Sequence, residues 1–61
     1  MDALAAFEAD ISRACLLAVR ARAHARRQMA RQQSGSAAIV SARLALTLDQ
    51  IASELEAEAR R

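Results

Sequence analysis

Hydrophobic residues recur along the chain at helical spacing on either side of a single break. The only glycine stands in the segment Gln32-Gln33-Ser34-Gly35-Ser36, and no other cluster of turn-forming residues exists. Glycine adopts the left-handed backbone that ends a helix, and serine accepts hydrogen bonds from the free N–H groups that begin the next helix. The pattern predicts one helix over about 3–32 with Asp2 as its N-cap, a turn around Ser34–Ser36, and a second helix over about 37–60.

A connection this short requires the two helices to lie antiparallel, so the expected fold is an all-α helical hairpin formed by one domain, residues 1–61. At 100° per residue, each helix carries one stripe of regularly spaced apolar residues, and we expect the two stripes to face each other. The predicted contact consists of Leu4, Phe7, Ile11, Ala14, Cys15, Ala18, Ala25 and Met29 on the first helix and Ala37, Val40, Ser41, Leu44, Leu48, Ile51, Leu55 and Ala59 on the second.

A single hairpin leaves several large apolar residues without cover. Some point away from the expected contact, and others lie so near the N-terminus that the second helix does not reach them. With the turn centred between Ser34 and Gly35, residue i lies opposite residue 69 − i, so Leu4 has no counterpart. This surplus predicts a homodimer in the form of an antiparallel four-helix bundle, or docking onto a larger protein. The expected partner or dimer interface consists of Leu4, Phe7, Ile11, Leu16, Leu17, Val19, Ile39 and Leu46.

The composition also favours association. Seventeen of the 61 residues are alanine, which leaves fifteen large apolar side chains for a core. One cysteine excludes an intramolecular disulfide, and no cysteine or histidine cluster has the spacing of metal ligands. At roughly 1.5 kcal/mol of ordering entropy per residue, a chain this short usually breaks even at best without such a cross-link.

Charge divides the predicted hairpin into two poles. Residues 11–33 carry a charge of +6 with no acidic residue, whereas residues 1–10 carry −3 and residues 49–61 carry −2. The basic residues therefore gather near the turn and the acidic ones near the open end. Two hairpins with their turns at opposite ends would bring each basic pole beside an acidic pole, which predicts an antiparallel dimer.

A basic ridge follows the first helix on the side opposite its apolar stripe. Its members are spaced 7, 4, 3 and 4 residues apart, span ~27 Å and comprise Arg13, Arg20, His24, Arg27 and Arg31. A solvated outer face is the simplest interpretation, and contact with an acidic partner or with the phosphates of a nucleic acid is the functional one. Because no aromatic residues interleave with the arginines, a structured RNA or duplex is the expected nucleic-acid ligand. In length, helix count and turn position, the hairpin is similar to the RNA-binding hairpin Rop.

Several function classes are excluded by what the sequence lacks. No glycine-rich phosphate loop and no set of nucleophile, base and orienting residue is present, so we expect no enzyme, no cofactor, no metal and no small-molecule substrate. The longest apolar run, residues 14–19, is too short to cross a membrane, and the N-terminus is acidic where a signal peptide is basic. The sequence therefore predicts a cytoplasmic, non-catalytic protein–protein interaction module of adaptor, co-chaperone or inhibitor type.

Overall fold

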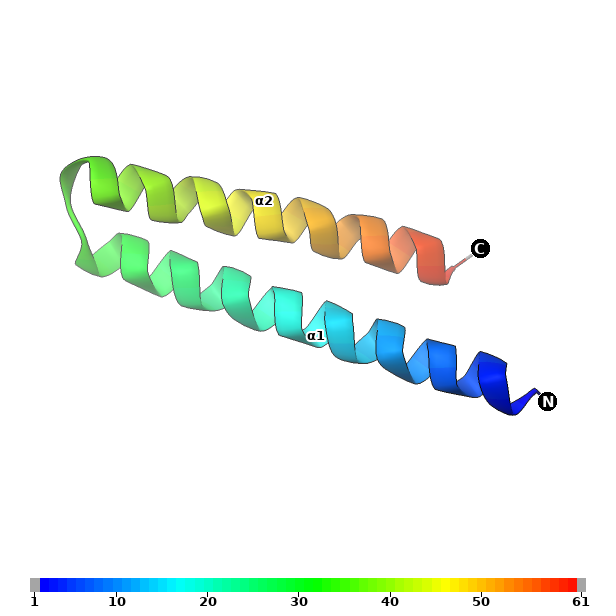
Figure 1. The fold of residues 1–61 in the computed structure, drawn as a ribbon. Coiled ribbons are helices and arrows are strands. Elements are labelled where there is room, and N and C mark those ends of the chain that lie inside the picture. Colours follow the sequence, from blue (N-terminus) through cyan, green and yellow to red (C-terminus); the bar gives the residue numbers. More distant parts are fainter. Residues whose placement is uncertain (1, 61) are drawn as a thin grey trace.

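Two long α-helices lie side by side and antiparallel in the computed structural model, which describes residues 2–60 (Figure 1). Helix α1 spans Ala3–Gln32 and helix α2 spans Gly35–Ala59. The all-α hairpin is confirmed, with no strand anywhere in residues 2–60. Helix α2 begins two residues earlier than predicted. The result is a rod whose longest extent is 51 Å.

The helix ends follow from local chemistry. The Leu4 backbone N–H donates to Oδ1 of Asp2 at 3.1 Å, which confirms Asp2 as the N-cap of α1. Gln33 and Ser34 have extended backbones, and Gly35 has a φ of +65°. This left-handed residue was expected to close α1, but it opens α2 instead. Ser34 is the N-cap of α2, yet its side chain forms no capping hydrogen bond.

The contact between α1 and α2, which we call the seam, is built largely from small side chains. Its residues recur alternately three and four positions apart, the spacing of a coiled coil, and their side chains are the best covered in the hairpin. Among residues 2–60, only Ala23, Ser41, Ala45 and Ala52 are buried. The seam consists of Leu16, Val19, Ala23, Arg26, Ala30 and Gln33 on α1 and Ala38, Ser41, Ala45, Leu48, Ala52 and Leu55 on α2.

The seam lies on a different side of α1 from the predicted contact. At 100° per residue, the two stripes are separated by roughly 110° around α1 and by about 60° around α2. The predicted stripe is exposed throughout on α1, and of its members on α2 only Ser41, Leu48 and Leu55 lie in the seam. Leu16 and Val19, which we expected to face a partner, are half-buried in the seam instead.

A hydrogen bond near the turn favours this rotation. The buried hydroxyl of Ser41 donates to Oε1 of Gln33 at 2.6 Å. Because a buried hydroxyl without a partner is costly, this bond holds Ser41 toward α1 and places the alanines of α2 in the same row. The sequence carries alanines on more than one side of α1, so periodicity alone did not identify the side that α2 covers.

We expect the seam to reject a larger side chain. Ala45→Leu places a branched side chain where the helices are in contact, which should lower the free energy of unfolding by about 1–3 kcal/mol. Ala42→Leu adds the same atoms at an exposed position of α2. It should change the free energy of unfolding by less than about 0.5 kcal/mol. Urea denaturation followed by circular dichroism, at one protein concentration, measures both. Equal effects of the two variants would contradict a tightly packed alanine seam.

Candidate partner-binding face

The seam separates two unlike faces of the hairpin. One of them, which we call the apolar face, carries large hydrophobic side chains from both helices that remain 38–61% exposed. Helical spacing puts these side chains on the same side of each helix, next to the seam. They are Leu4, Phe7, Ile11, Met29, Val40, Leu44 and Ile51.

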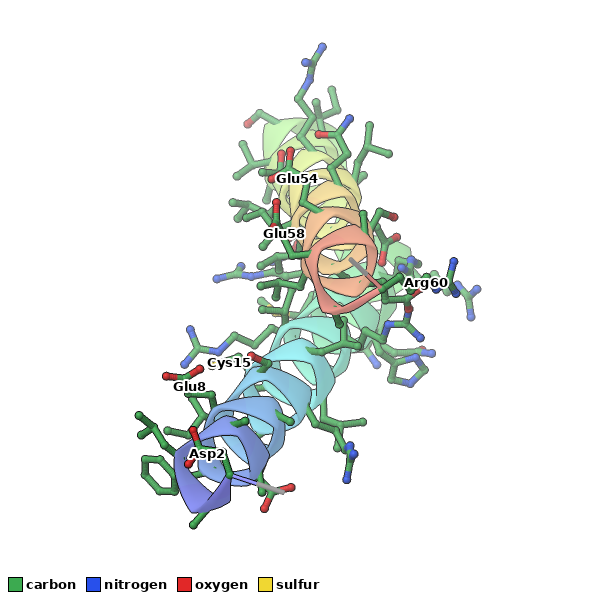
Figure 2. All side chains as sticks on the ribbon, turned by 90° about the vertical axis from the view of Figure 1, so that its right-hand side faces the viewer. Asp2, Glu8, Cys15, Glu54, Glu58 and Arg60 are labelled. Atoms are coloured by element: carbon green, nitrogen blue, oxygen red, sulfur yellow. The ribbon has the colours of Figure 1, made fainter. Side chains whose placement is uncertain are left out.

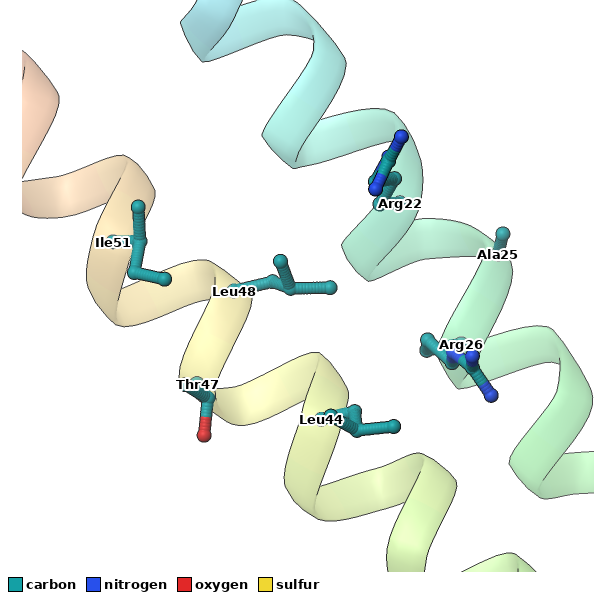
Figure 3. A pocket seen from close by; sticks show the side chains of 7 residues that line it. All are labelled: Arg22, Ala25, Arg26, Leu44, Thr47, Leu48 and Ile51. Atoms are coloured by element: carbon teal, nitrogen blue, oxygen red, sulfur yellow. The ribbon is translucent and has the colours of Figure 1, made fainter.

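An open groove of about 560 Å³ lies on the apolar face between the helices (Figure 3). Leu44 and Leu48 of α2 point across it toward α1. Arg22 and Arg26 of α1 line the same groove, so it combines an apolar floor with guanidinium groups. Its remaining lining residues are Ala25, Thr47 and Ile51.

The N-terminal half of α1 extends the apolar face beyond the seam. Every residue of this segment, which we call the arm (residues 2–15), is exposed. The arm includes Leu4 at 60% exposure and Phe7, the chain's one aromatic residue, at 61%. The prediction that a single hairpin leaves both residues uncovered is confirmed. Cys15, expected in the helix contact, is an exposed free thiol.

Charges are ordered along the apolar face. Glu8, Glu54 and Glu58 lie on one side of the hairpin, together with Cys15 and opposite Arg60 (Figure 2). Glu8 lies 18 residues, or five turns, before Arg26 and therefore on the same side of α1. The groove arginines lie in the half of the hairpin nearer the turn, and these acidic residues lie in the half nearer the open end.

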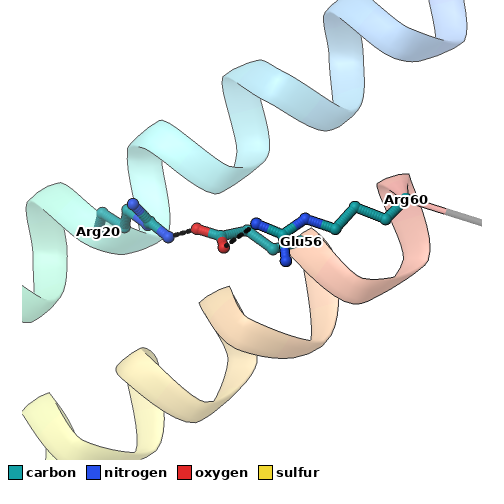
Figure 4. Close-up of polar contacts among 3 residues, drawn as sticks. All are labelled: Arg20, Glu56 and Arg60. Carbon is teal, nitrogen blue, oxygen red and sulfur yellow. Dashed lines mark ion pairs between the residues drawn. The ribbon is translucent and has the colours of Figure 1, made fainter.

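The opposite face, which we call the charged face, is closed by ion pairs between the helices. Arg20 pairs with Glu56, and Arg27 pairs with Asp49. Glu56 also pairs with Arg60 at 3.8 Å, so it lies between two guanidinium groups (Figure 4). These side chains are 29–81% exposed, where a pair contributes at most about 1 kcal/mol.

The charged face corrects the predicted position of the basic ridge. The ridge flanks the seam instead of lying opposite to it, so Arg20 and Arg27 reach carboxylates on α2. Nη1 of Arg13 lies 3.9 Å from Oδ1 of Asp10 on α1. The side chains of His24 and Arg31 are exposed. The sequence contained a signal for these pairs. Arg20 and Arg27 are seven residues apart, and Asp49 and Glu56 are also seven residues apart. The matching period places both pairs on one flank of an antiparallel contact.

Three further residues of the predicted interface are exposed on the outer surfaces of the hairpin. Leu17, Ile39 and Leu46 are 61–62% exposed, and each directly follows a seam residue. That position of a coiled-coil repeat points away from both the seam and the apolar face. Their part in partner binding stays a prediction.

Residues 2–60 contain no group of three or more histidine, cysteine or acidic side chains arranged to hold a metal ion. Neither of the two helices in this part of the chain has the length and apolar character to cross a membrane.

No family model matches this chain, and neither a curated protein nor a solved structure shows significant similarity to it. The interpretation of the two faces therefore depends on the chain's own geometry and chemistry.

The ion pairs of the charged face should orient the helices while adding little stability. In a double-mutant cycle of Arg27→Ala and Asp49→Ala, we expect a coupling energy of about 0.2–1 kcal/mol in urea denaturation, because both side chains are nearly half exposed. The same cycle with Arg31→Ala in place of Arg27→Ala is the control and should show no coupling. A coupling well above 1 kcal/mol would mean that the charged face is a main source of stability.

Proposed function

We propose that this chain is a small non-catalytic protein–protein interaction module, of adaptor, co-chaperone or inhibitor type, that binds through its apolar face. The observation that carries the proposal is the distribution of apolar side chains. The fully covered side chains of the seam are three alanines and a serine, while ten large hydrophobic side chains from the two helices stay exposed.

The free energy of hydrophobic burial favours the binding of a partner to this face. Burying one leucine, isoleucine or phenylalanine contributes about 1.5–3 kcal/mol, whereas each alanine contributes far less. Each large side chain of the apolar face that a partner covers therefore adds more free energy of burial than an alanine of the seam does. A partner on this face supplies the hydrophobic core that the hairpin lacks.

The shape of the face favours a helical partner. Its apolar residues lie in two parallel rows along α1 and α2, with the groove between them. Such rows accept the three- and four-residue spacing of an amphipathic helix. Two further helices laid along the face complete a four-helix bundle, the arrangement in which helical hairpins bury an apolar side.

The second candidate function, binding of structured RNA or duplex through the basic ridge, has less support. Three of the five ridge side chains, Arg13, Arg20 and Arg27, have carboxylate partners within the chain. Phosphate binding would compete with those carboxylates. The pairing favours the apolar face as the site of binding.

A matched pair of substitutions tests the proposal. Leu44 lies in the groove and Leu46 on the outer surface of the same helix. Leu44→Asp should weaken association roughly a hundredfold, because it replaces an exposed leucine, which the partner would cover, with a carboxylate, while Leu46→Asp should leave association unchanged. Sedimentation equilibrium measures association with a second copy, and titration of any captured protein measures association with another chain.

The test also separates the two candidate functions. Apolar docking should change little between 50 and 200 mM salt, whereas phosphate binding falls steeply over that range. Association that survives Leu44→Asp but is lost with Arg20→Glu and Arg27→Glu would contradict docking through the apolar face. Loss with Leu46→Asp alone would move the interface to the outer surface.

A further inference from the structure

We infer that the occupant of the apolar face is a second copy of this chain, with the two turns at opposite ends. Helix α1 then packs along the partner's α1, and α2 along the partner's α2. This inference rests on the proposed function, since it names the partner of the same face. Three observations carry it: the exposed area, the order of charges, and the order of large and small side chains.

The exposed area matches that of one half of a dimer. The hairpin exposes 4930 Å². A folded monomeric protein of 6.6 kDa is expected to expose about 3,900 Å². The excess of roughly 1,000 Å² is close to the ~800 Å² that each subunit buries in a standard protein interface. A second copy therefore removes about the surface that this chain has in surplus.

Symmetry allows two ways to place a second copy on the face. If the turns lie at the same end, α1 packs on the partner's α2, and the groove arginines of both copies gather at that end. If the turns lie at opposite ends, each helix packs on its own copy, and basic groups meet acidic ones. The charge order on the apolar face selects the second arrangement, because like charges brought together are destabilising.

The length of α1 fixes the register of this dimer. The helix runs over Ala3–Gln32, so full overlap of two antiparallel copies places opposite each other the residues whose numbers add up to about 35. Glu8 then lies opposite the partner's Arg26, and Ile11 lies opposite the partner's Ala25. The same level of the partner holds the groove, which Arg26 and Ala25 line.

Large and small side chains are ordered in a complementary way. The arm carries Leu4, Phe7 and Ile11, whereas the middle of the same stripe consists of Ala14, Ala18 and Ala21. In the inferred register, the alanines of both copies cross at the two-fold axis, where small side chains let the helices approach closely. The arm of each copy then reaches the groove end of the other and covers its exposed Leu44.

The charges on helix α2 favour the same orientation of the two copies. Because Gln32 and Gly35 lie at the same level beside the turn, the two-fold axis set by α1 pairs residues of α2 whose numbers add up to about 99. Arg43 then lies between the levels of the partner's Glu54 and Glu58. Opposite charges therefore meet on both pairs of helices in this single register.

Disulfide trapping tests the arrangement. Ala18→Cys in a Cys15→Ser background places two thiols beside the two-fold axis, and we expect nearly complete cross-linking into dimers under mild oxidation. Leu4→Cys in the same background is the matched control. Its thiols lie about 40 Å apart in the inferred dimer, so it should not cross-link within a dimer. Cross-linking through Leu4→Cys but not Ala18→Cys would overturn the orientation.

Charge exchange tests the register independently. Arg26→Glu should raise the dimer dissociation constant roughly tenfold, since symmetry places two such residues opposite a partner carboxylate. Adding Glu8→Arg should bring it back to within about threefold of the original value. Arg31→Glu, which changes the charge by the same amount on the basic ridge, is the control and should have little effect. Failure of Glu8→Arg to restore the Arg26→Glu variant would overturn the register.

The outcomes distinguish this inference from the proposed function. A dimer that Leu44→Asp dissociates but Ala18→Cys does not trap overturns the orientation and leaves the proposed function standing. A monomer that binds a different protein, and loses it with Leu44→Asp, overturns the second copy as occupant and again leaves the proposed function standing. A monomer whose binding is unaffected by Leu44→Asp overturns both.

Discussion

The close contact of small side chains between α1 and α2 is the constraint on which the rest of the structure depends. Alanine and serine in the middle of the seam bring the helices together but bury little hydrophobic surface. A hairpin that centres its contact on alanines leaves its isoleucines, its phenylalanine and several of its leucines on the outside. The exposed apolar face is therefore a direct consequence of the seam and not a separate feature.

The charged face shows how the rotation of the helices is maintained without a large core. Arg20 and Arg27 meet Glu56 and Asp49 across one flank of the seam. Exposed pairs of this kind contribute little free energy, but they favour one rotation of α1 over others. Ser41 and Gln33 do the same at the turn. Polar contacts thus help to select which side of each helix faces its neighbour, while the opposite face keeps large apolar side chains exposed.

The parts of this fold that depend on local chemistry could be predicted from the sequence. Asp2 caps α1, a single glycine marks the turn, and uninterrupted helix formers fill both helices, so the helix bounds follow from neighbouring residues. The rotation about each helix axis does not follow in this way. It depends on the pairing of Ser41 with Gln33 and of two arginines with two acids across the hairpin, interactions between residues far apart in the chain.

The predicted contact between the helices was wrong on α1 because an apolar stripe does not identify the surface that covers it. A periodic apolar stripe indicates that a helix face is buried, but it does not say against which surface. The stripe that begins at Leu4 starts well before the level at which α2 ends, because α1 has 30 residues and α2 has 25. A stripe that extends past its neighbour within the chain cannot be covered by that neighbour along its whole length. The strongest apolar pattern in this sequence therefore lies on the face that α2 leaves exposed, and the weaker alanine pattern describes the contact within the hairpin.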